Sequence, residues 1–350
     1  VRKIQQGREE TIRPCTGANY CLDRIYQGGM ALCIHNAATG REQTMPHDIS
    51  RAEISRRVVI VGAGPAGLEA ARVAALRGHD VTVLEAADAA GGQIRLTART
   101  PRRKELMGII DWRMAQCEQL NVVFHFNMLA EANDILALSP ELVIIATGGV
   151  AHDQLYETQE HQHHLVTSWD ILSGDVVPSG DVLIYDEAGD HAGLQAAEVA
   201  LQAGARVEIM TPDRTFAPEV MAMNLVPYMK TLQHDNVTFT VTKRLMGVER
   251  AGNRLCAVIG TDYSDRITHS EYDQIVLNYG TLPLCDVYFD LREYASNGGA
   301  VDQQALIDGK PQRIRRNPNG KFQLFRIGDA VSARNTHAAI YDALRLMKDT

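Results

Sequence analysis

The sequence has no apolar run long enough to cross a membrane, so we expect no membrane-spanning helix. It is also poor in positive charge: 35 Lys and Arg stand against 43 Asp and Glu, a net charge of −8. No stretch resembles a basic patch, and we expect neither a nucleic-acid nor a membrane partner. The chain begins with neither an initiator Met nor an apolar signal region, and we interpret it as a fragment of a longer polypeptide or a processed chain.

Cysteine is scarce as well, with six residues in 350, and three of the six fall within one short segment. This distribution does not resemble a secreted disulfide framework and favours a reducing compartment, which we take to be the cytoplasm. Cys15, Cys21 and Cys33 lie in an irregular, glycine-containing segment, where soft thiolates can converge on an iron–sulfur cluster. The other three occupy positions typical of small buried hydrophobic residues: Cys117, Cys256 and Cys285.

The most informative stretch is residues 56–93, where a predicted buried strand over 58–61 leads into a G-x-G-x-x-G motif. In a dinucleotide site the first glycine makes a tight turn, the second admits a pyrophosphate, and the third packs the helix against the sheet. The helix N-terminus then offers free N–H groups to the phosphates, and an acid at the end of the next strand binds the ribose. These roles predict a dinucleotide site at Gly62, Gly64, Ala66, Gly67 and Glu85.

The motif recurs later in the chain. Shifting the first unit by 126 positions places Gly67 on Gly193 and Ala71 on Ala197 (67 + 126 = 193). We therefore predict an α/β fold with two Rossmann-like dinucleotide-binding domains, the second inserted in the first. The expected parts are a cysteine-containing segment and linker over 1–52, a first domain over 53–175 and 286–350, and a second domain over 176–285.

The second copy differs where the chemistry takes place. Ala188 replaces Gly62 and Asp190 replaces Gly64, so a carboxylate stands where a pyrophosphate would have to approach. Thr211 stands in place of the ribose-binding acid. Two interpretations follow: a unit kept for packing whose nucleotide site is lost, which we favour, or a modified site that binds NAD(P)H through other contacts.

Together the motifs resemble the C-terminal half of the NADH:flavin oxidoreductase, or old yellow enzyme-like, family. That family includes 2,4-dienoyl-CoA reductase, trimethylamine and dimethylamine dehydrogenases and N-methylproline demethylase-like proteins. The resemblance covers essentially the whole chain and is carried by Arg13-Pro14-Cys15, Cys21, Cys33, the Gly62 motif, Gly91-Gly92-Gln93, Ala146-Thr147-Gly148 and Gly328-Asp329-Ala330. It implies a glutathione-reductase-like pair of domains that follows a cysteine segment with a [4Fe-4S] cluster and an N-terminal barrel that binds FMN.

The chain departs from this family at position 18, where the pattern has a cysteine three residues after Cys15 and this sequence has Ala18. Three interpretations stay open: a three-thiolate cluster with another ligand, a lost cluster, or a segment without metal.

The resemblance also implies further cofactor contacts. Asp329 matches the acid that meets the flavin ribitol, and Gly92 and Gln93 match the path of the diphosphate and ribitol. Thr147 and Gly148 match the passage beside the adenine half. Because some family members hold ADP where others hold FAD, the choice between these two ligands stays open.

The resemblance thus implies an electron-transfer module of an oxidoreductase, which binds FAD or ADP and exchanges electrons with an FMN barrel of the same polypeptide. We expect no catalytic residue within it, while an external electron partner and homo-oligomer formation stay open. One alternative, an NAD(P)H-dependent flavin disulfide reductase, needs a redox-active cysteine pair, and the sequence contains no C-x-x-C. The other alternative is a module that holds ADP for structural reasons.

Overall fold

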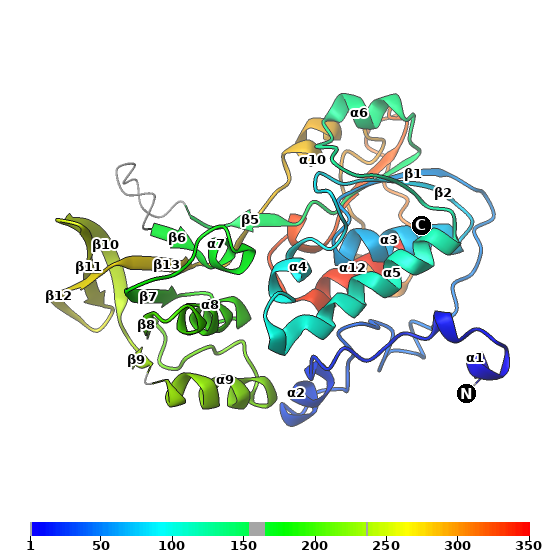
Figure 1. The fold of residues 1–350 in the computed structure, drawn as a ribbon. Helices are drawn as coiled ribbons and strands as arrows, with labels where there is room; N and C mark the ends of the chain where they lie inside the picture. The colour runs from blue at the N-terminus through cyan, green and yellow to red at the C-terminus, as the bar shows by residue number, and fades with distance from the viewer. Residues whose placement is uncertain (1, 154–164, 236) are drawn as a thin grey trace. The chain divides into compact units, whose positions relative to one another are not determined.

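The computed structural model describes residues 2–153, 165–235 and 237–350, and the chain divides into two compact units (Figure 1). Unit 1 comprises Val1–Arg95, Glu105–Val150 and Leu282–Thr350, and unit 2 comprises Leu96–Lys104 and Ala151–Thr281. The strands β5 (Gly149–Ala151) and β14 (Thr281–Pro283) lie where the chain passes between the units, and they pair with each other. Among the described residues, no helix combines the length and apolar character that a membrane span requires.

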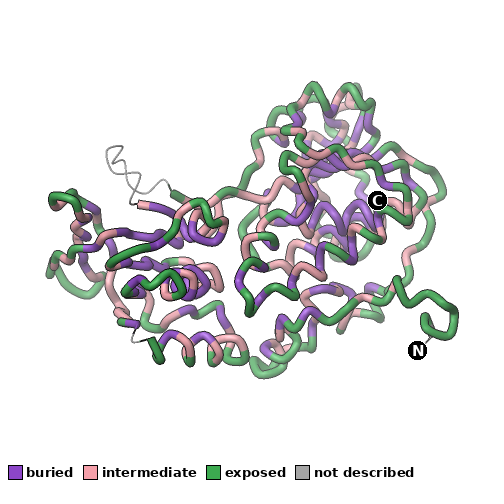
Figure 2. The backbone as a smooth tube through the Cα atoms, in the orientation of Figure 1, coloured by how far each residue is buried: buried purple, intermediate pink, exposed green. Residues whose placement is uncertain are grey.

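Unit 1 is built on a five-stranded parallel sheet in the order β15-β4-β1-β2-β3. Its strands are β1 (Arg57–Val61), β2 (Asp80–Leu84), β3 (Val123–His125), β4 (Leu142–Ile145) and β15 (Gln323–Arg326). All of β4 and most of β1 are buried, as expected of Val- and Ile-rich strands covered on both faces (Figure 2).

Three helices of twelve residues form one layer of unit 1. They are α3 (Pro65–Leu76), α5 (Gly108–Gln119) and α12 (Thr336–Met347), and both α5 and α12 pack against α3. Shorter helices complete the unit: α1 (Arg2–Gln5), α2 (Tyr20–Tyr26), α6 (Ala132–Ala137), α10 (Asp286–Leu291), α11 (Gln303–Asp308) and 3-10 turns at Glu9–Thr11, Arg292–Tyr294 and Gly328–Ala330. An apolar cluster of buried side chains joins β1, β4 and β15 to α6 and α10.

Unit 2 repeats this plan with a five-stranded parallel sheet in the order β6-β13-β7-β8-β9. Its strands are β6 (Leu165–Thr167), β7 (Asp181–Asp186), β8 (Arg206–Met210), β9 (Thr238–Thr240) and β13 (Gln274–Asn278). An antiparallel sheet of β10 (Arg244–Ala251), β11 (Arg254–Thr261) and β12 (Ser264–Tyr272) packs against it through an apolar cluster. The helices are α7 (Ser168–Ser173), α8 (His191–Gln202) and α9 (Ala222–His234).

The predicted fold class is confirmed, and the internal repeat is visible in the helix bounds. Helix α8 begins and ends 126 residues after α3, since 191 − 65 and 202 − 76 both equal 126. The elements β6 and α7, which we expected to precede the border at residue 175, belong to unit 2, because β6 pairs with β13. Between β2 and β3 the chain forms α4 (Gln93–Thr97), a 3-10 helix (Pro101–Met107) and then α5.

Candidate functional site

The turn between β1 and α3 is shaped by close backbone packing at two glycines. Gly62 has a φ of +101°, and a Cβ there would lie 2.3 Å from the carbonyl oxygen of Ala146. A Cβ on Gly67 would lie 1.9 Å from the carbonyl oxygen of Gly62. Because both neighbours are backbone atoms that cannot move aside, these two positions accept only glycine. They press the start of α3 against the ends of β1 and β4.

Gly64 has the opposite surroundings. A Cβ added there would meet no atom within 4 Å, so open space lies beside this position. Gly64 is the N-cap residue of α3. Among the described residues, no side chain accepts a hydrogen bond from the free N–H groups at this helix end, and the first turn contains no acidic residue. The positive end of the helix dipole therefore has no capping side chain and no acidic residue in its own first turn. This arrangement fits a bound diphosphate.

Glu85 follows β2 and lies against the same turn. Its carboxylate accepts hydrogen bonds from the backbone N–H groups of Ala63 (2.6 Å) and Ala87 (2.8 Å). Because a carboxylate has about four acceptor sites, two remain available for ribose hydroxyls.

Two residues 236 positions apart meet near the start of α3. The side-chain amide of Gln93 donates to a carboxylate oxygen of Asp329 (3.1 Å), and the N–H of Arg334 donates to the other oxygen (3.1 Å). Asp329 is brought there by Gly328, where a Cβ would approach the Cβ of Ala66 at 3.0 Å. Burial raises the pKa of Asp329, although the hydrogen bonds from Arg334 and Gln93 partly oppose the rise.

The predicted contacts Thr147 and Gly148 follow β4 at the same edge of the sheet. The hydroxyl of Thr147 donates to the carbonyl oxygen of Leu284, and the backbone N–H of Leu284 donates to the carbonyl oxygen of Gly148 (3.0 Å). Gly148 has a φ of +70° and open space around its Cα. The predicted residues of unit 1 thus lie at the carboxyl ends of β1, β2, β4 and β15 or in the turns beside them. Ligands bind at this edge of open parallel sheets.

The cysteine segment does not show a comparable arrangement. Cys15 and Cys21 are exposed and Cys33 is half-buried. Within the described part of the chain, no three His, Cys, Asp or Glu side chains are grouped so that they could hold a metal ion. Ala18, where the family pattern has a cysteine, is buried. The thiols as placed therefore do not fit an iron–sulfur cluster.

Protein contacts hold this segment in place instead. His337 on α12 is hydrogen-bonded through Nδ1 to the carbonyl oxygen of Cys33 (2.8 Å), and its ring stacks on Tyr20. The His35 ring bonds the carbonyl oxygen of Pro14 (3.0 Å). The contact of His337 fixes the segment against α12, and that of His35 joins two parts of the segment.

A buried charge cluster that the sequence did not reveal joins the cysteine segment to α3. Glu69 is fully buried and lies 2.6 Å from Arg72 and 2.9 Å from Arg113, with Arg13 at 4.0 Å. Burial alone would raise the pKa of Glu69, but the three guanidinium groups together hold it well below its usual range. Only the i, i+3 spacing of Glu69 and Arg72 was visible in the sequence.

In unit 2 the position equivalent to Gly64 is filled by a carboxylate. Asp190 caps α8 by accepting from the N–H of Ala192 (2.9 Å), and Asn278 donates to both Asp190 (3.0 Å) and Asp186 (2.8 Å). Burial, with a contribution from Asp190, raises the pKa of Asp186 to about 7, although the hydrogen bond from Asn278 opposes the rise. The helix N-terminus is thus already occupied by an anion of the protein itself. These residues do not fit a diphosphate.

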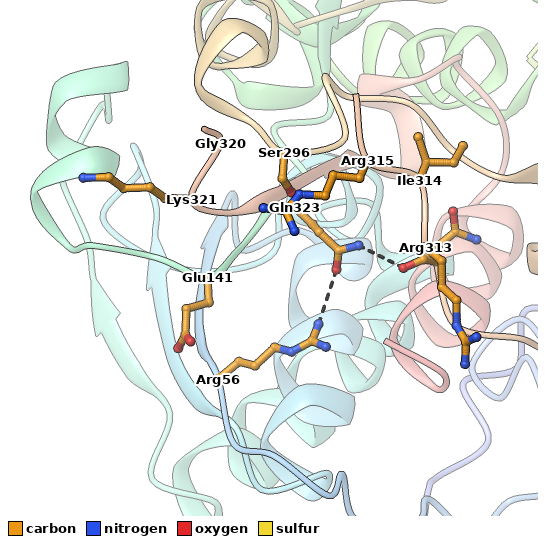
Figure 3. Close-up of a pocket in the computed structure, with 10 residues that line it drawn as sticks. Arg56, Glu141, Ser296, Arg313, Ile314, Arg315, Gly320, Lys321 and Gln323 are labelled. Carbon is orange, nitrogen blue, oxygen red and sulfur yellow. Dashed lines mark hydrogen bonds between the residues drawn. The ribbon is translucent and has the colours of Figure 1, made fainter. Parts of the chain in front are cut away.

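The fold also creates a basic pocket, although we expected no basic patch from the sequence. It has a volume of about 340 Å³ and lies in unit 1, where Arg56 precedes β1 and Gln323 begins β15 (Figure 3). It therefore lies at the amino ends of the strands, opposite the glycine turn. Its cationic residues come from two segments that are far apart in the sequence: Arg56 from one, and Arg313, Arg315 and Lys321 from the other.

Comparisons with known proteins agree with this geometry. A family model described as pyridine nucleotide-disulphide oxidoreductase matches residues 56–342. A probable N-methylproline demethylase of Rhizobium meliloti is 63% identical over 349 residues, which are 100% of this chain and 51% of the relative. An N,N-dimethylglycine/sarcosine dehydrogenase of Chromohalobacter salexigens is 41% identical over 360 residues, covering 100% of this chain and 52% of the relative.

Two solved structures share this fold but differ in how much of their own length the chain covers. Histamine dehydrogenase from Rhizobium sp. 4-9 superimposes with a TM-score of 0.82 at 25% identity, over 99% of this chain and 52% of that protein. Thioredoxin reductase of Lactococcus lactis, at 17% identity, shares the fold with a TM-score of 0.59 over 84% of this chain and 97% of its own. The chain spans about half the length of the curated relatives described here.

Proposed function

Because the chain belongs to the pyridine nucleotide-disulphide oxidoreductase family, we propose that unit 1 binds FAD and exchanges electrons within a larger flavin-dependent enzyme. Family membership confirms the expected resemblance and the oxidoreductase class. The observation that carries the proposal is the open space beside Gly64 at the uncapped start of α3.

Each predicted residue has a defined task in this proposal. The N–H groups at the start of α3, near Gly64 and Ala66, hold the diphosphate, and Glu85 orients the adenosine ribose. Asp329, held by Gln93, accepts hydrogen bonds from the ribitol hydroxyls. Thr147 and Gly148 border the nucleotide half. When bound, FAD supplies the electron-accepting and electron-donating chemistry, and these residues bind it and exclude water.

We further propose that unit 2 is retained for packing and takes no NAD(P)H. Asp190 stands at the position equivalent to Gly64, where a diphosphate would approach, and repulsion between like charges in a partly buried site costs several kcal/mol. Electrons then reach unit 1 from another domain of the same polypeptide, for which the family resemblance indicates a barrel with FMN. The names of the two curated relatives favour N-methylated amino acids as substrates of the whole enzyme.

The cysteine segment receives no step in this proposal. An iron–sulfur cluster is a prediction of the family resemblance alone. The thiols of Cys15, Cys21 and Cys33 as placed form no ligand set that would support it. Free thiols on six cysteines are consistent with a cytoplasmic location.

The test is to identify the cofactor of the purified full-length protein and its electron donor. The domain-specific readout is the nucleotide released on denaturation, supported by the visible absorbance of a flavin. We expect FAD to be released and NADH to reduce the bound flavin no faster than a buffer control. Release of ADP without FAD would favour the structural-nucleotide alternative, and rapid reduction by NADH would overturn our interpretation of unit 2.

A further inference from the structure

We propose that the basic pocket of unit 1 binds a small polyanion of the phosphate class, at a site separate from the FAD site. Four cations and one anion line it: Arg56, Arg313, Arg315, Lys321 and Glu141. The formal charge of the lining is therefore +3 (four positive minus one negative), within a chain whose net charge is −8. A local charge of this sign attracts anions that the rest of the surface repels.

Within the described part of the chain, no ion pair neutralises the four cations. Glu141 is directed toward another residue: it accepts the N–H of Arg57 (2.9 Å) and lies 3.9 Å from the guanidinium of Arg57. Among the residues that the structure describes, no carboxylate lies within 4.0 Å of the charged groups of the four cations. Figure 3 shows Arg56 pointing toward Gln323, to which it donates a long hydrogen bond of 3.3 Å. An anion would therefore have no internal ion pair to displace.

The backbone that carries these side chains is fixed by hydrogen bonds. The Gln312 side chain is buried and makes two hydrogen bonds to the backbone of Asp302, at 2.7 and 3.0 Å. The main-chain carbonyl of Gln312 accepts a hydrogen bond from the side-chain amide of Gln323 (2.9 Å). A Cβ on Gly320 would lie 2.3 Å from the nitrogen of Ser296, so these two segments are in direct backbone contact. The cations thus extend from a preformed frame, which lowers the entropic cost of binding.

The size of the pocket favours a small molecule over a macromolecule. Small-molecule sites typically measure about 300–1,000 Å³, and a volume of about 340 Å³ accommodates a compact ligand with two phosphate groups. The pocket lies at the amino ends of β1 and β15, whereas the glycine turn lies at the carboxyl ends. An anion here therefore does not compete with FAD, and this inference does not depend on the proposed function.

The test is a calorimetric titration of the full-length protein, saturated with FAD, with inorganic pyrophosphate at low and physiological ionic strength. We expect one site whose affinity falls as salt is added. Arg313→Gln and Lys321→Gln each remove one cation that makes no hydrogen bond to another described residue, so the fold should be unaffected. Each should weaken binding about fivefold, the effect of losing one charge contact of about 1 kcal/mol.

Arg214→Gln is the matched control, since Arg214 is an exposed arginine of unit 2 and its loss changes the net charge by the same amount. We expect it to leave the affinity unchanged. Absence of pyrophosphate binding would refute the proposal, as would equal weakening by Arg214→Gln, which would indicate only a general field. Binding of an acidic peptide such as poly-glutamate, without pyrophosphate binding, would also refute it and indicate a protein partner. Melting temperatures of all variants without ligand verify that they are folded.

Discussion

Replacing Gly64 by aspartate should abolish FAD binding without unfolding the protein, because it transfers the Asp190 substitution of unit 2 into unit 1. The backbone of Gly64 (φ −74°, ψ −176°) is close to that of Asp190 (φ −101°, ψ −171°), so an aspartate fits there without strain. A Cβ at Gly64 meets no atom within 4 Å. As the N-cap residue, Asp should stabilise α3 by about 0.3 kcal/mol relative to Gly.

The effect on binding follows from the charge. A carboxylate about 4 Å from a phosphate, at an effective dielectric constant of about 20, costs roughly 4 kcal/mol, which lowers the affinity about a thousandfold. Gly64→Ala places a methyl group in the same space without a charge. It should therefore weaken binding much less than Gly64→Asp.

The assay is titration of the flavin-free protein with FAD, followed by the change in flavin fluorescence, together with thermal unfolding without ligand. We expect wild type and both variants to melt at similar temperatures and to differ only in affinity for FAD. If Gly64→Asp binds FAD as wild type does, the diphosphate does not lie at Gly64 and the assigned site is wrong.

Three further predictions concern stability. Gly67→Ala forces a methyl group against the Gly62 carbonyl and should lower the free energy of unfolding by about 1–3 kcal/mol, measured by urea denaturation. Glu69→Gln leaves buried guanidinium groups, including Arg113, without their anion and should cost about 3–5 kcal/mol; an unchanged urea midpoint would show that this cluster contributes little. Asp186 has a folded pKa of about 7, above its unfolded value of about 3.9, so the folded protein binds a proton there more tightly than the unfolded chain does. The resulting contribution to the free energy of unfolding is complete below the unfolded pKa and is lost as the pH rises through 7. Asp186→Asn should therefore raise the melting temperature more at pH 8 than at pH 5, and an equal shift at both would contradict the assigned pKa.

Much of unit 1 could be predicted from local sequence patterns. The glycine spacing located the turn at Gly62, and the repeat of 126 residues located α8 from α3. These features could be recognised because each depends on residues that are close in sequence: a buried strand, a turn and a helix. Gln93 and Asp329 are distant in sequence, and their places beside one cofactor were expected from a family resemblance rather than from local patterns, which did not indicate the hydrogen bond between them.

The features that we missed depend on contacts between distant residues. The Glu69 cluster draws Arg13 and Arg113 from two other segments, so no spacing rule indicates it. The basic pocket brings Arg56 together with residues 313–321, because β1 and β15 both pair with β4. The three cysteines are close in sequence, yet the fold does not group them as metal ligands, since convergence of side chains depends on the path of the whole segment.

We propose that this chain holds one dinucleotide, FAD, in unit 1. The most direct measurement is to quantify the nucleotides released by the denatured full-length protein and its Gly64→Asp variant after saturation with FAD and NADH and removal of unbound ligand. We expect one FAD bound at this chain and no nicotinamide nucleotide in the wild type, and loss of that FAD in the variant. Retention of FAD by the variant, or an NADH molecule retained through unit 2, would contradict it.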